Sequence, residues 1–175
     1  MTTPKVADKA TGETVTPRPG WGDVLREAAV EVFSTMIGVT LHFPAEVDNL
    51  PVDAAPPDKS SLAYVTAMIG IAGAMRAVFS LRCSDRAATR VASRMLAISA
   101  PEAAAHSGDA VGEVCNMIAG HFKHKIGFGA SCSLTVPTVV AGGSYSIHCL
   151  EKGERIEFPV ACEGETLTIT LDIRG

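Results

Sequence analysis

Apolar residues recur with a helical period in two long stretches of the chain. With about 100° of rotation per residue, one side of the second stretch collects Val111, Val114, Cys115, Ile118, Phe122 and Ile126, and the other collects Asp109, Glu113, Asn116, Gly120 and His124. The first stretch, about 23–37, predicts Leu25, Ala29, Val32, Phe33 and Met36 in the core and Glu27, Glu31, Ser34 and Gly38 outside. Both stretches therefore predict amphipathic helices that lie on a core.

The other periodic stretches alternate apolar and polar residues with a period of two, which is typical of strands. They predict strands at about 39–47, 62–71, 75–81, 131–136, 146–150, 154–162 and 166–173, with a hairpin reversal at 72–74. A further helix is expected at about 86–98 after a cap at Ser84 or Asp85, and the helix carrying Glu113 is expected to open at Ser107 or Asp109. This order favours an α+β fold with long helices stacked on a mainly antiparallel sheet.

Both long helices carry an acid, a polar residue and a glycine at one spacing. Glu31, Ser34 and Gly38 are followed by Glu113, Asn116 and Gly120, and the differences 113−31, 116−34 and 120−38 are each 82. We interpret this offset as an internal duplication. The copies differ at the middle position, because the first carries a hydroxyl and the second a carboxamide.

The composition narrows the class of protein. A chain of 175 residues fits one domain, expected at 20–175, while residues 1–19 lack large apolar side chains and are expected to form a disordered tail. The formal charge of −4, with scattered basic residues, argues against nucleic-acid binding. Five cysteines without a Cys-x-x-Cys spacing indicate reduced, packed thiols. No secretory signal or membrane span is recognisable, so we expect a cytoplasmic protein that does not bind a membrane.

An exposed acid and amide one helical turn apart can do little chemistry alone. A carboxamide can orient a water molecule through one donor and one acceptor, and a carboxylate can bind a partner's lysine, so Glu113 and Asn116 suit the completion of another protein's active site. No metal site is expected, because His121 and His124 with Glu113 lack a further strong ligand at helical spacing. Cys115 lies on the apolar face, which favours a core thiol over a nucleophile.

One run of residues matches a known family. The run Asp109-Ala-Val-Gly-Glu113-Val-Cys-Asn116-Met-Ile-Ala-Gly120 resembles the signature helix of the CheC/CheX/FliY family of chemotaxis phosphatases, and the CheX branch fits best. Supporting stretches lie at 69–73, 92–96 and 136–140, and the resemblance covers roughly residues 21–174. It implies an internally duplicated CheC/CheX-like fold.

The resemblance also implies a function and its residues. Family members are implied to hydrolyse the aspartyl phosphate of response-regulator receiver domains. Asn116 would position the attacking water and Glu113 would pair with the receiver's lysine, while the receiver, CheY-like, would supply Mg²⁺ and this chain would need no cofactor of its own.

Further roles follow from the same resemblance. Asp109, Gly120 and Lys123 would contact the partner, with a simple packing role as the alternative for Gly120, whereas Glu31 and Ser34 would form a degenerate second site. A homodimer made by joining sheets is expected. The alternative is a non-catalytic module that binds receivers or flagellar-switch components through the same helix, and Asn116→Ala separates the two because only a phosphatase would lose turnover while still binding.

Overall fold

The computed structural model describes residues 19–43, 63–143, 145–147 and 153–174. Its helices are α1 (Trp21–Val32), continued by the π-helical turn η1 (Phe33–Ile37), then α3 (Asp85–Leu96), α4 (Ala100–Ala103), the 3₁₀ turn η2 (Ala104–His106) and α5 (Ser107–Lys125). Its strands are β1 (Tyr64–Gly73), β2 (Arg76–Ser84), β3 (Cys132–Leu134), β4 (Thr138–Gly142), β5 (Gly153–Cys162) and β6 (Glu165–Arg174). Residues 1–18, which form nearly all of the expected tail, lie outside the described part.

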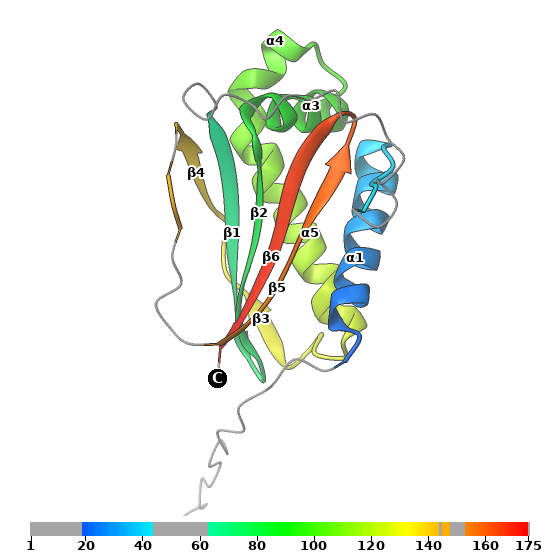
Figure 1. Ribbon diagram of the computed structural model, residues 1–175, viewed down its shortest axis with the longest axis vertical. Helices are drawn as coiled ribbons and strands as arrows, with labels where there is room; N and C mark the ends of the chain where they lie inside the picture. The colour runs from blue at the N-terminus through cyan, green and yellow to red at the C-terminus, as the bar shows by residue number, and fades with distance from the viewer. Residues whose placement is uncertain (1–18, 44–62, 144, 148–152, 175) are drawn as a thin grey trace, which may run out of the picture.

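The strands form one sheet in the order β3-β1-β2-β6-β5, and β4 pairs with β1 on the same side as β3. Every described strand pair is antiparallel. In Figure 1, α3 and α5 lie behind the strands and α1 lies alongside them, so helices cover one face of the sheet. The α+β class and the mainly antiparallel sheet are therefore confirmed.

Helix α5 is fixed against the centre of the sheet. Its thiol at Cys115 is fully buried and donates to the carbonyl of Ala67 on β1 (3.5 Å). Nearer its C-terminal end, the ring of Phe122 meets Trp21 of α1 edge to face, with 5.9 Å between ring centroids. Buried contacts in the middle and near the C-terminal end give the exposed side of α5 a defined position.

Two local predictions are confirmed by the backbone. The hydroxyl of Ser84 accepts a hydrogen bond from the amide of Ala87 (3.1 Å), which makes Ser84 the cap of α3. The hairpin reversal follows Gly73, whose φ of 131° favours glycine. A Cβ there would lie 2.2 Å from the carbonyl oxygen of Ser131, so a larger residue would displace one of the two chains.

The end of the first helix differs from the prediction. Met36 was expected in the core but is 50% exposed, and Ile37 is buried instead. The hydroxyls of Ser34 and Thr35 both donate to the backbone carbonyl of Glu31 (3.1 and 2.6 Å), and the helix widens into the π turn η1 at this point. The wider turn rotates the following residues away from the regular helical phase.

Two predicted strands are wrong within the described residues. The segment at 39–43 forms only an isolated bridge, in which His42 and Ala161 exchange two backbone hydrogen bonds (2.9 and 2.8 Å). Residues 145–147 are not a strand, and the rest of both predicted strands, 44–47 and 148–150, lies outside the described residues. The predicted strand at 131–136 is shorter, Cys132–Leu134.

Two further elements of the structure were not predicted from the sequence. β4 pairs with β1 although no strand was expected there. Helix α4 opens with a capping box, in which Glu102 accepts hydrogen bonds from the amide and hydroxyl of Ser99 (3.1 and 2.7 Å). The proline at 101 therefore belongs to the start of a new helix.

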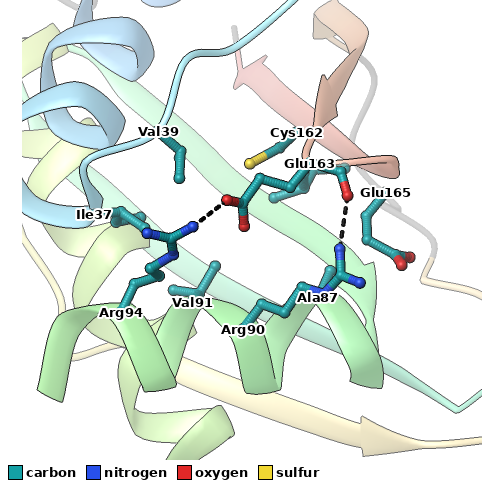
Figure 2. Close-up of a pocket in the computed structure, with 10 residues that line it drawn as sticks. Ile37, Val39, Ala87, Arg90, Val91, Arg94, Cys162, Glu163 and Glu165 are labelled. Atoms are coloured by element: carbon teal, nitrogen blue, oxygen red, sulfur yellow. Dashed lines mark hydrogen bonds and ion pairs between the residues drawn. The ribbon is translucent and has the colours of Figure 1, made fainter. Parts of the chain in front are cut away.

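A cluster of charges joins α3 to the turn between β5 and β6 (Figure 2). Arg90 donates to the backbone carbonyl of Glu163 (2.6 Å), and Arg94 pairs with the carboxylate of the same residue. The cavity beside them holds about 10 Å³, which is room for one water molecule at most. We interpret this cluster as a structural tie rather than a ligand site.

Candidate active site

The exposed side of α5 carries the predicted acid and amide. Glu113 is exposed, and Asn116 and Gly120 are half-buried, while the apolar side of the helix is buried as the helical wheel predicts. Within the described residues, no hydrogen bond or ion pair engages the side chain of Glu113 or of Asn116. Asp109, one turn before Glu113, is exposed on the same side. This side of α5 therefore presents an acid and an amide that are free to bind another molecule.

The segment 134–139, which links β3 to β4, runs along one flank of α5. A Cβ at Gly120 would lie 3.9 Å from Leu134, and a Cβ at Gly112 would lie 3.2 Å from Val139 and 3.6 Å from Pro137. Gly112 therefore allows a close approach that an alanine would crowd. The segment was not predicted as part of the site, because its place beside α5 depends on the sheet.

Lys123 lies on this same flank of α5. Its ammonium group donates to the backbone carbonyl of Cys132 on β3 (2.8 Å). In this arrangement Lys123 ties the helix to the sheet, and its contact with a partner stays a prediction.

The opposite flank of α5 meets α1 through charges. The carboxylate of Glu31 lies 3.3 Å from the ammonium of Lys125 and 3.4 Å from the Nδ1 atom of His121. These two groups, His121 first, lower the pKa of Glu31 below its ordinary value. Lys125 also donates to Glu27 (3.0 Å), and the hydroxyl of Ser34 donates to the backbone of its own helix. The acid of the first copy is thus engaged inside the chain.

The described residues do not form a metal site or an activated cysteine nucleophile. They contain no group of three or more His, Cys, Asp or Glu residues placed to hold a metal ion. Burial raises the pKa of the Cys115 thiol to about 12, so it stays protonated at neutral pH. Four of the five cysteines are free and buried, and Cys149 lies outside the described residues. None of the described helices is long and apolar enough to span a membrane.

Comparison with known proteins identifies the family. A family model described as "Chemotaxis phosphatase CheX" matches residues 65–161, which is 97 of the 175 residues and includes both Glu113 and Asn116. The chain belongs to the CheX family. The resemblance inferred from the signature helix is thereby confirmed. A search of curated proteins found no match.

Solved structures of CheX and its relatives share the fold. A chemotaxis protein CheX from Desulfovibrio desulfuricans is 22% identical, with a TM-score of 0.68 over 88% of this chain and 99% of that chain. CheX of Borrelia burgdorferi, in a complex with CheY, BeF₃ and Mg²⁺, is 19% identical, with a TM-score of 0.67 over 90% and 100%. FliY of Thermotoga maritima is 15% identical, with a TM-score of 0.59 over 91% and 92%.

Proposed function

We propose that this chain hydrolyses the aspartyl phosphate of a CheY-like response-regulator receiver domain, with Asn116 positioning the attacking water and Glu113 pairing with the receiver's lysine. The observation that carries the proposal is the unengaged acid and amide on the rigid helix α5 of a CheX-family chain. The complex of Borrelia burgdorferi CheX with CheY supports a receiver as the class of partner.

The proposed hydrolysis depends on the positioning of water and receiver more than on a reactive side chain of this protein. Water attacks phosphorus, the bond between phosphorus and the aspartate oxygen breaks, and aspartate and inorganic phosphate are released. The carboxamide of Asn116 accepts from and donates to the water, which holds it in line, and the carboxylate of Glu113 fixes the receiver through its lysine ammonium. Mg²⁺ belongs to the receiver, where it would neutralise charge on the phosphoryl oxygens, and this chain adds no cofactor.

In this proposal only α5 is active, and the chain is proposed to be internally duplicated. The hairpins β1–β2 and β5–β6 begin 89 residues apart (153−64 and 165−76), and they meet at the centre of the sheet through β2 and β6, which supports a duplication. The first copy is a degenerate site for two reasons. Its acid, Glu31, is held by Lys125 and His121, and the hydroxyl of Ser34 is shorter than a carboxamide.

The homodimer is proposed to form through β4. This strand is exposed along its whole length, carries no charge, and pairs with β1 only, so one edge of it has no strand partner within the described residues, although the carbonyl of Val140 accepts a hydrogen bond from the Tyr145 hydroxyl (3.1 Å). At the other side of the sheet, β5 carries Pro159 and several charged residues, and His42 bridges to it. Proline and charge disfavour pairing between strand edges, so β4 is the better edge for a second copy.

Phosphate release from phosphorylated receiver domains of the same organism tests the proposal. The wild-type protein should accelerate release from at least one receiver in the presence of Mg²⁺. Asn116→Ala should lose that acceleration and still bind the receiver, whereas Glu113→Ala should weaken both. No acceleration across the full set of receivers, from folded protein, would favour a module that binds the receiver without catalysis.

A further inference from the structure

We propose that the segment 134–139, with Val136 at its centre, is the apolar half of the docking surface for the phosphorylated receiver. This inference rests on the proposed function and names the residues that would hold the partner beside Glu113 and Asn116. Val136 is the segment's most exposed large apolar residue, with 84% of its surface accessible.

The packing along α5 places Val136 level with Asn116. Leu134 lies beside Gly120 and Pro137 lies beside Gly112, so the segment runs antiparallel to the helix. Asn116 is midway between those glycines, one turn from each. Eight helical residues span about 12 Å and three extended residues about 10 Å, so the two paths match in length. The residues between Leu134 and Pro137 therefore pass beside Asn116.

Hydrogen bonds hold this part of the segment to the sheet. The amide of Thr135 donates to the carbonyl of Gly70 (2.9 Å), and the amide of Gly70 donates to the hydroxyl of Thr135 (2.9 Å). A Cβ at Gly70 would lie 2.9 Å from the Thr135 methyl group, so the two chains are in close contact. Thr135 is thereby bound to β1, and Val136 is the residue left to project from a fixed backbone.

The surface around Val136 adjoins the residues that are proposed to bind the receiver. No residue from 126 to 147 is charged, so the segment that carries Val136 is uncharged, and on this flank of α5 the ammonium group of Lys123 is bound to the carbonyl of Cys132. The opposite flank carries the ion pairs of Lys125 with Glu27 and Glu31. A receiver that brings its lysine to Glu113 and its phosphate to Asn116 would place adjoining surface over Val136.

Substitution of Val136 by Asp tests the inference. Because Val136 is exposed, the fold should survive, and melting temperature checks this directly. The matched control is Ile147→Asp, which adds the same charge at a 44% exposed apolar residue lining a hollow of about 460 Å³ on the outer face of the sheet. Dephosphorylation kinetics, and binding of a receiver loaded with beryllium fluoride and Mg²⁺, are measured for both variants.

Val136→Asp should raise KM and the receiver dissociation constant by about tenfold or more and leave kcat within about threefold, because the lost contact lies outside the reacting atoms. Ile147→Asp should match the wild type. If Val136→Asp unfolds, Val136→Ser is used and should raise KM by about threefold or more.

Three results would overturn the inference or its premise, and they are distinguishable. Unchanged KM in Val136→Asp, with an active wild type, removes the docking role alone. A change from dimer to monomer with receiver binding intact assigns Val136 to a contact between copies. A wild type that is inactive on every receiver removes the proposed function, and binding of the loaded receiver then tests the docking surface independently.

Discussion

Replacing Gly120 by alanine distinguishes the effect of this residue on stability from its effect on receiver binding. Gly120 lies inside α5 with helical geometry, and a Cβ added there would lie 3.9 Å from the side chain of Leu134, which is ordinary van der Waals contact. Alanine is favoured over glycine inside a helix by about 0.5–1 kcal/mol. The fold itself therefore does not require glycine at this position, and Gly120→Ala should stabilise the protein.

For a chain of this size, that gain corresponds to a rise in melting temperature of about 1–4 °C. The proposed receiver contact predicts the opposite effect on function, because the added methyl group stands on the exposed side of α5, one turn from Asn116. We expect KM for the phosphorylated receiver to rise by about fivefold or more while stability increases. Thermal unfolding and phosphate release measured on the same preparation check both expectations.

The matched control for Gly120→Ala is Gly112→Ala. A Cβ at Gly112 would lie 3.2 Å from a methyl group of Val139, so the gain in helix propensity is offset by crowding, and the melting temperature should not rise. Unchanged KM in Gly120→Ala would refute a receiver contact at this glycine. Loss of stability in Gly120→Ala would refute the reasoning from the helix itself.

Three further predictions concern other parts of the molecule. Val140→Lys places a charge on the open β4 edge and should shift a dimer towards monomer in light scattering, without lowering the melting temperature by more than a few degrees. In a Cys149→Ser background, the buried thiols, Cys115 among them, should resist alkylation at pH 8 until the protein unfolds, as mass spectrometry would detect. His121 and Lys125 lower the folded-state pKa of Glu31, so the stabilisation by the Glu31 carboxylate is present above the ordinary pKa near 4.5 and is lost as the pH falls through the lowered pKa. The difference in melting temperature between the wild type and Glu31→Gln should therefore be present at pH 7 and disappear in acid.

The sequence predicts the elements that depend on local spacing. The buried and exposed sides of α5 follow from a period of 3.6 residues, and Ser84 caps α3 as its residue type predicts. The capping box at Ser99 and Glu102 is also a local pattern, although no helix was predicted at these residues. The helical period alone failed to predict the exposure of Met36, because the helix changes from α to π geometry where the hydroxyls of Ser34 and Thr35 donate to the carbonyl of Glu31.

Part of the candidate site could likewise be predicted from local sequence spacing, and part could not. Glu113 and Asn116 lie on the same side of one helix, so their proximity can be predicted from their spacing in the sequence. The place of Val136 beside Asn116 is not local, since it depends on β3 and β4 pairing with opposite ends of β1 and on the close approach at Gly112. The uncharged run at 126–147 was a signal that an apolar surface existed, but it did not say which helix that surface would flank.

The two copies of the acid differ in their surroundings more than in their spacing. Glu31 faces α5, and the residues that hold it, His121 and Lys125, come from the same helix that presents Glu113 on its exposed side. A carboxylate already paired with an ammonium group in its own chain gains little from a second ammonium group offered by a receiver. The contact that joins α1 to α5 therefore favours the proposal that only α5 is active, and an amide introduced at position 34 would leave the acid beside it engaged.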